Sequence, residues 1–318
     1  MRKRNVHKNN VARRFAGAKA QSAMEYLMTY GWAILIIAVV LGALFQLGVF
    51  NANNFAPKAP PGACQVFRPN GPYTTSFINL EGICNGELPQ YGAYLVNGAG
   101  MINVSLSSAP MTPQLTISAW EYQPYINGEA DIVRMCCEGY YGDCGYSWGL
   151  VYVPVANSIT TGSLNIEDGW MFGSDNWWSS AIPSYPIYRW NFFAATYNRQ
   201  SGTVDAYLNG QLANSIIVTV GGNTPSTGNL FSIGWNCAGG PAGGYIANVQ
   251  IYNTSLSANE IQALYQEGIG GAPIDLQYLV GWWPLNGNAN DYSGNNNNGF
   301  DVENINFVSN WWSGYTPP

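Results

Sequence analysis

Residues 190–212 read WNFFAATYNRQSGTVDAYLNGQL, two apolar runs joined by a polar turn and followed by a second turn at Asn209-Gly210. An Asn-Gly pair between apolar runs is a strong signal of a β-hairpin, because both residues tolerate positive φ. Similar short runs, rich in β-branched and aromatic residues, recur at 116–122, 230–235 and 245–252. Segments rich in Gly, Asn and Pro separate them. The pattern predicts an all-β sandwich or barrel.

Three motifs resemble the laminin-G-like, concanavalin-A-like jelly rolls: ISAW at 117–120, the stretch 190–212, and GYIANVQIYNTSLSANEIQALYQEG at 244–268. The resemblance covers roughly residues 89–271, and it implies a two-sheet sandwich that binds glycans or proteins, in some members through calcium. Within the third motif, Ser257 and Glu260 have the spacing of a capping box. They predict a short helix that ends at Gly268.

The C-terminal stretch 279–300 begins LVGWWPLNGNANDYSGNNNNG and resembles the first strand and loop of such a domain, although here it comes last. Three interpretations are open: a circularly permuted fold, a strand donated to a neighbouring subunit, or a remnant of a second domain. Return to its own sheet is favoured, because it closes an exposed edge at the smallest entropic cost.

The N-terminal region has a basic leader, then Glu25, then an uncharged apolar run from Tyr26 to Phe50. This order resembles the class III signal of archaeal type IV pilins, cut between Ala20 and Gln21 so that Glu25 becomes the fifth residue. It implies a removed leader at 1–20, a filament-core helix at 21–50, a linker at 51–62 and a head at 63–318. The fold class expected is therefore α+β, a long apolar helix followed by a jelly roll.

Burial gives Glu25 a role in assembly. An acidic residue at the centre of a membrane helix costs about 3 kcal/mol unless it is paired. Cleavage would create a positive amine on Gln21, and the resemblance implies that Glu25 pairs with this amine of a neighbouring subunit. A helix over 21–50 would be about 45 Å long, against a hydrocarbon core of about 30 Å. An uncleaved signal anchor is the alternative.

Charge and cysteine content place the head outside the cell. Of 12 basic residues, seven lie in the leader, so the mature chain would keep 12 − 7 = 5 basic against 18 acidic residues, a net charge of −13. Such a chain should repel nucleic acid. The basic leader keeps the amino terminus in the cytoplasm, so the chain beyond the apolar run is exported.

Six cysteines suit an oxidising compartment and predict three disulfides. They are Cys64, Cys84, Cys136, Cys137, Cys144 and Cys237. Six cysteines allow 15 pairings; we favour Cys64 with Cys84 and the other four among themselves. A zinc site lacks support, because there is no CxxC pair and the only histidine lies in the leader. Two sequons, at Asn103 and Asn253, predict glycosylation.

Candidate ligand-binding residues lie in loops. Trp170, Trp177 and Trp178 would stack on sugars if exposed; the alternative places their rings in the core or at a subunit contact. Oxygen ligands for calcium would come from Asp168 and Asp175, or from Asn290 and Asp291, although Asx turns explain them more simply.

Catalysis finds little support. Glu129 and Asp131 are the nearest approach to paired acidic residues, and a solvated strand end explains them. We therefore expect no enzyme.

These observations favour an extracellular filament subunit whose head serves adhesion or glycan binding. Its expected partners are copies of itself, a prepilin peptidase with the pilus assembly machinery, surface glycans, and the membrane before assembly. The alternatives are a non-polymerising, membrane-anchored surface lectin and a tethered glycan hydrolase.

Overall fold

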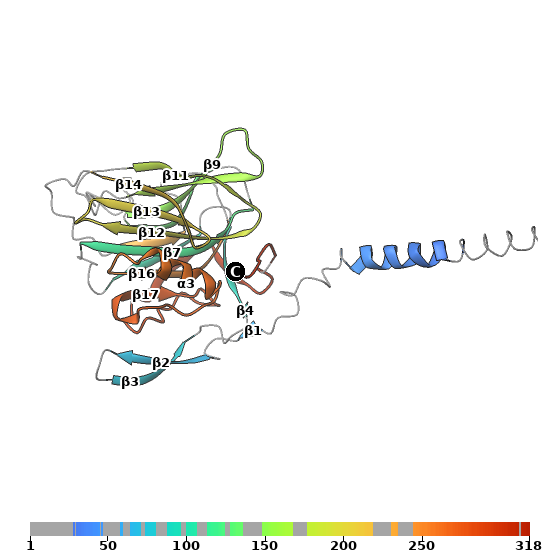
Figure 1. The fold of residues 1–318 in the computed structure, drawn as a ribbon. Helices are drawn as coiled ribbons and strands as arrows, with labels where there is room; N and C mark the ends of the chain where they lie inside the picture. Colours follow the sequence, from blue (N-terminus) through green and yellow to red (C-terminus); the bar gives the residue numbers. More distant parts are fainter. Residues whose placement is uncertain are drawn as a thin grey trace, which may run out of the picture. The chain divides into compact units, whose positions relative to one another are not determined.

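A computed structural model describes most of the chain after residue 27. The described residues are 28, 30–44, 46, 58–59, 64–70, 74–80, 88–96, 100–106, 113–124, 128–135, 148–167, 177–218, 230–234, 244–311 and 313–318. The chain divides into two compact units, Met1–Phe55 and Ala56–Pro318 (Figure 1). The second unit thus begins within the predicted linker.

In the first unit, residues 28, 30–44 and 46 are helical. Their apolar side chains are largely uncovered, with Trp32 and Ile34 each 65% exposed. These residues lie within the predicted helix 21–50, whose ends lie outside the described residues. No helix in the described part of the chain is both long and apolar enough to cross a membrane.

The second unit is a sandwich of two antiparallel sheets, as predicted (Figure 1). One sheet has seven strands in the order β11 (Trp177–Pro186), β10 (Thr161–Glu167), β9 (Trp148–Pro154), β8 (Ala130–Met135), β15 (Leu230–Gly234), β6 (Met101–Ser105), β18 (Gly299–Glu303). The other runs β14 (Gln211–Ile217), β13 (Thr203–Leu208), β12 (Trp190–Asn198), β7 (Gln114–Tyr122), β16 (Tyr245–Tyr252), β5 (Gly92–Leu95), β19 (Ile305–Val308), and β17 (Leu279–Trp283) also pairs with β16.

Two smaller ladders accompany the sandwich. β1 (Lys58–Ala59) pairs in parallel with β4 (Leu88–Pro89), and β2 (Cys64–Asn70) forms a hairpin with β3 (Thr74–Leu80). Because β1 lies within 51–62, the structure places the start of ordered pairing earlier than the predicted head boundary at residue 63.

Two apolar cores form on the two faces of the eight-stranded sheet. Successive residues of a strand point to opposite faces, so Ile117 and Ala119 of β7 enter the core between the sheets, whereas Trp120 enters a second core on the outer face. The helix α3 (Ala258–Gln266) covers this second core with Ile261 and Leu264.

The turn and cap signals in the sequence are confirmed. Asn209 and Gly210 have φ of 49° and 75°. At the start of α3, the Ser257 amide donates to Glu260 Oε2 at 2.6 Å, and the Glu260 amide donates to Ser257 Oγ at 3.4 Å. Gly268, with φ of 82°, follows the helix.

The tail, residues 279–318, returns to its own sandwich, as the favoured interpretation predicts. Three register pairs join the two: Trp283 opposite Val249, Phe300 opposite Asn103, and Phe307 opposite Ala93. β18 is the last strand of one sheet and β19 the last of the other. Before the tail lies the short 3-10 helix η4 (Leu276–Tyr278).

Candidate functional site

Four neighbouring strands of the larger sheet each contribute one aromatic residue to a single cross-strand row. Tyr94 lies opposite Tyr245, Tyr245 opposite Tyr122, and Tyr122 opposite Trp190. Successive ring centroids are 4.8, 5.7 and 6.0 Å apart, with interplanar angles of 37°, 81° and 46°. We call these four residues the aromatic row.

The aromatic row lies on the outer face of the eight-stranded sheet. The neighbours Ala93 and Ile246 enter the inner core, so Tyr94 and Tyr245 point the other way. Tyr94, Tyr122 and Tyr245 are half-buried and keep part of their surface exposed.

The tail anchors one end of the row. Trp190 is buried; its Nε1 donates to the Trp311 carbonyl at 3.0 Å, and the two indoles meet at 90° with centroids 5.5 Å apart. Burial, and next the neighbouring Tyr188, raise the pKa of Tyr122, so its hydroxyl stays a neutral donor. The arrangement is a contiguous cluster of tilted aromatic rings, three of which carry a phenolic hydroxyl.

Beneath the row, on the inner face, lies a buried carboxyl. Desolvation raises the pKa of Glu121 to about 8, a shift that nearby Tyr185 opposes. Tyr185 lies near this carboxyl, and its hydroxyl makes no regular hydrogen bond within the described residues. Glu121 Oε2 and both side-chain polar atoms of Gln123 also lack a hydrogen-bond partner within those residues. The carboxyl therefore stays protonated at neutral pH, inside the sandwich.

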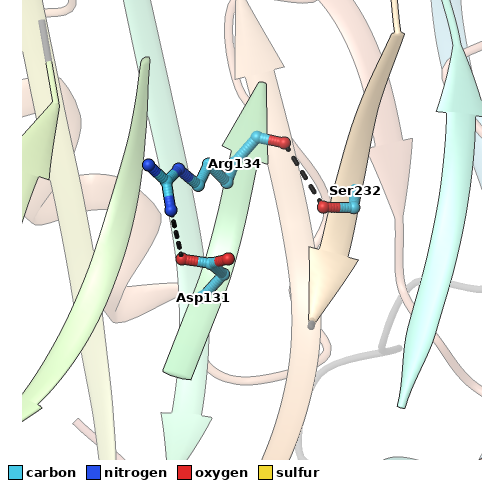
Figure 2. A network of polar contacts seen from close by, with 3 residues as sticks. All are labelled: Asp131, Arg134 and Ser232. Carbon is cyan, nitrogen blue, oxygen red and sulfur yellow. Dashed lines mark hydrogen bonds and ion pairs between the residues drawn. The ribbon is translucent and has the colours of Figure 1, made fainter. Parts of the chain in front are cut away.

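A second polar cluster lies on the outer face of the seven-stranded sheet (Figure 2). Arg134 contacts Asp131 at 3.5 Å, and Ser232 Oγ donates to the Arg134 carbonyl at 3.4 Å. Asp131 is only 1% exposed. The expectation of a solvated strand end is therefore wrong for Asp131, because the ion pair offsets part of the cost of burying its carboxylate.

Comparison with known proteins identifies the fold. Residues 97–262 match the laminin G-type family model of the concanavalin A-like lectin/glucanase superfamily. The chain belongs to this superfamily. No curated protein matches the sequence.

Several solved structures are similar to this chain in fold alone. One is a Bacteroides ovatus protein assigned as carbohydrate-binding, at 17% identity and TM-score 0.48, covering 70% of this chain and 61% of that one. Another is the SAP-like pentraxin of Limulus polyphemus, at 14% identity and TM-score 0.44, covering 58% of this chain and 86% of that one. A third is the CBM40 of the Ruminococcus gnavus IT-sialidase, at 16% identity and TM-score 0.38, covering 55% of this chain and 96% of that one. This chain thus spans less than two thirds of the Bacteroides protein.

Several predicted site residues lie outside the described residues. They are Ala20, Gln21, Glu25, Cys84, Cys136, Cys137, Cys144, Cys237, Trp170, Asp168 and Asp175. Cys64 begins β2, opposite Leu80. The backbones of Trp177 and Trp178 start β11, opposite Glu167 and Ile166, and their side chains are not described. The disulfides and the tryptophan site stay predictions.

The structure shows Asp291 in the loop role that an Asx turn would give it, and calcium binding stays a prediction. Its Oδ1 accepts from the amides of Trp282 (3.0 Å) and Ser293 (2.8 Å), and its Oδ2 accepts from Ser293 Oγ (2.8 Å) and the Asn297 amide (2.9 Å). With four protein donors, this carboxylate organises its own loop. The Asn290 backbone amide donates a hydrogen bond to Asn288 Oδ1 at 2.9 Å. The described residues contain no group of three or more His, Cys, Asp or Glu that could hold a metal.

The Asp291 carboxylate should stabilise the head without calcium. We expect Asp291→Ala to lower the free energy of unfolding by about 3 kcal/mol, since hydrogen bonds to a charged group contribute about 1.5–3 kcal/mol each and are not additive. Urea unfolding measures the loss, with Asn290→Ala as the matched control. A melting temperature that falls when EDTA is added to the parent chain would contradict this assignment.

The two predicted glycosylation sites differ in accessibility. Asn103 lies in β6 between β15 and β18 and is 3% exposed. A side chain this buried leaves little room for a glycan in the folded head, and glycosylation at Asn103 stays a prediction. Asn253 is half-buried after β16, and its glycosylation stays a prediction.

Proposed function

We propose that this chain is an extracellular filament subunit whose jelly-roll head binds glycans through the aromatic row. The observation that carries the proposal is the alignment of three half-buried tyrosines and a tryptophan across four adjacent strands. Their contact distances make the rings one continuous cluster, in which Tyr245 and Tyr122 meet edge to face. The superfamily includes lectins by name, which agrees with the proposal, although fold alone does not fix function.

Tyrosine is suited to sugar recognition. Its ring offers a flat apolar face for the C–H groups of a sugar, and its hydroxyl reaches the polar edge of the same molecule. The tail covers the row at Trp190, so we propose that a glycan lies along the half-buried Tyr94, Tyr245 and Tyr122. The ordered strands fix the rings before the ligand arrives, and this lowers the entropic cost of binding.

A binding role agrees better with the site than a catalytic one. Burial raises the pKa of Glu121 to about 8, but this carboxyl faces the interior and is 3% exposed. A general acid or base must come within hydrogen-bond reach of its substrate. We therefore propose no enzyme activity and no required cofactor, and a polysaccharide hydrolysis screen tests the glycan hydrolase alternative.

The exposed helix supports the filament part of the proposal. Residues 30–44 present apolar side chains around the helix, and such a surface in water is stabilised when it is covered. Copies of the same helix are the proposed cover, after a prepilin peptidase and the assembly machinery draw the subunit from the membrane. The alternative is a surface lectin that does not polymerise, and sequencing the mature amino terminus separates the two.

Substituting the two tyrosines farthest from Trp190 in the row should weaken sugar binding without unfolding the head. We expect the double variant Tyr94→Ala, Tyr245→Ala to bind its glycan about 10-fold more weakly, as aromatic contacts contribute about 0.5–1.5 kcal/mol each beyond burial. A glycan array, followed by titration of the best ligand, measures the change. Tyr278→Ala, in η4 and 42% exposed, is the matched control. Equal affinities for the row variant and the control would contradict the proposed site.

Glu25 is expected to act in assembly alone. Glu25→Gln should leave the subunit exported and membrane-held but unassembled, because it removes the charge that pairs with a neighbouring amine. Electron microscopy of sheared filaments measures the filament yield, and immunoblots of membranes measure the amount of membrane-held subunit. Lys8→Gln, in the leader, is the control. A normal filament yield from Glu25→Gln would remove the support for an intersubunit charge pair.

A further inference from the structure

Residues 187–189 connect β11 to β12, and their backbone is held in place. The Tyr188 amide donates to the Gln123 carbonyl at 3.0 Å, and the Arg189 carbonyl accepts from Asn191 Nδ2 at 3.2 Å. The side chains of Tyr188 and Arg189 nevertheless point to solvent, with Tyr188 46% exposed. A fixed backbone therefore presents an aromatic ring and a guanidinium at the surface.

This presentation is energetically unfavourable for the fold alone. Tyr188 has φ of 62°, in the left-handed region, which costs a residue with a Cβ atom about 1–2 kcal/mol. Burial of the side chain offsets only part of that cost, because Tyr188 stays 46% exposed. Backbone conformations of this kind persist where the surroundings fix them, and they concentrate at functional sites.

The connection adjoins the aromatic row. Arg189 directly precedes Trp190, and Gly314 lies between the connection and Tyr122. A Cβ atom on Gly314 would be 2.7 Å from Cε2 of Tyr122 and 3.1 Å from the Cα of Arg189. Gly314 therefore packs between the ring of Tyr122 and the backbone of Arg189.

Arg189 is unusual in its charge environment. Residues 56–318 contain five basic and 17 acidic side chains. Among the described residues, Arg134 pairs with Asp131, but no ion pair involves Arg189. A guanidinium presents a planar fork of donors that matches the two oxygens of a carboxylate or the oxygens of a sulfate. Within the described residues this exposed fork has no carboxylate partner, so we expect it to be available to an external anion.

We propose that the aromatic row and Arg189 form one site for anionic glycans. Sugar rings lie on the tyrosines, and a carboxylate or sulfate group of the glycan accepts hydrogen bonds from Arg189. This inference rests on the proposed glycan binding and names its ligand class. The acidic surface of the head opposes anionic ligands at long range, but salt screens that repulsion beyond about 8 Å. The contact with Arg189 then decides between charged and neutral sugars.

The test uses the purified full chain on an array of matched glycan pairs. Each pair holds a uronic-acid oligosaccharide and its carboxyl-reduced form, or a sulfated oligosaccharide and its desulfated form. We expect the anionic member to bind better in at least one pair. Arg189→Gln should weaken that binding about 10- to 100-fold and leave the neutral member unchanged. Arg199→Gln, which removes the same charge at the other end of β12, is the control.

The outcomes separate this inference from the proposed function. If neutral and anionic members bind equally, or if Arg189→Gln matches Arg199→Gln, the anionic preference is wrong while glycan binding stands. If neither member of any pair binds, both the preference and the proposed glycan binding are contradicted. Loss of both members in the Tyr94→Ala, Tyr245→Ala variant, with loss of the anionic member alone in Arg189→Gln, is the pattern that supports both.

Discussion

A chain that stops after Tyr278 is expected not to fold its sandwich. The truncation removes β17, β18 and β19, which pair with strands of both sheets. It also removes Trp282 and Trp283, each fully buried in one of the two cores. Losing one such side chain costs about 3–5 kcal/mol, and a domain is stable by only about 5–15 kcal/mol. Circular dichroism and sedimentation of the truncated chain measure the loss of structure and the aggregation.

A single substitution gives the graded version of this test. Trp283 packs its ring 5.2 Å from that of Phe231, and its Nε1 donates to the Asn297 carbonyl at 2.9 Å. We expect Trp283→Ala to lower the free energy of unfolding by about 3–5 kcal/mol. Phe300→Ala, also in the tail but 41% exposed, should change it by less than about 1 kcal/mol. A truncated chain that melts like the full one would show that the tail is an appendage.

The second large effect is a dependence of head stability on pH through Glu121. Burial raises the pKa of this carboxyl from 4.5 to about 8 in the folded protein. Below pH 4.5 both the folded and the unfolded chain hold the proton, and its stabilising contribution is fully present. Between pH 4.5 and 8 only the folded chain holds it, so unfolding releases a proton and stability falls as the pH rises. The total loss is about 5 kcal/mol.

Glu121→Gln isolates this contribution, because glutamine has nearly the shape of the protonated side chain and does not titrate. We expect the free energy of unfolding of the parent chain, relative to Glu121→Gln, to decrease steadily from pH 4.5 to 8 and to be flat outside that range. Denaturant unfolding at several pH values measures the difference. A constant difference across the range would mean that Glu121 ionises as easily in the folded head as in the unfolded chain.

The features that were predictable from sequence depend on contacts close in the chain or on a strong pattern. The Asn209-Gly210 turn and the Ser257–Glu260 capping box involve residues within three positions of each other, so their chemistry can be read locally. The return of the tail also followed from a physical rule, because an apolar strand without a partner leaves an exposed sheet edge. In the structure its two tryptophans, Trp282 and Trp283, enter separate cores, as alternation along a strand requires.

The aromatic row could not be predicted from sequence. Tyr94, Tyr122, Trp190 and Tyr245 lie far apart in the chain, and only the register of four non-consecutive strands aligns them. One signal was present: Tyr122 follows Trp120 at the strand period, so both lie on the outer face. The position of Tyr94 in the row depends on the pairing of β5 with β16, and no local sequence pattern indicates that pairing.

Burial of polar residues was the other source of error. Asp131 and Asn103 have the composition of exposed positions, and sequence alone places them at the surface. The structure buries both on the outer face of the seven-stranded sheet. Asp131 has Arg134 three residues away, a spacing that could have suggested the ion pair, whereas the burial of Asn103 follows from its position between β15 and β18.

The most direct measurement is a filament structure at side-chain resolution, determined by electron cryomicroscopy with the best-binding oligosaccharide from the array. The account predicts sugar density over Tyr94 and Tyr245, on the outer face of the eight-stranded sheet, in subunits joined through their N-terminal helices. Sugar density over the seven-stranded sheet instead, or an aromatic row covered by a neighbouring subunit and closed to any ligand, would contradict the proposed glycan site.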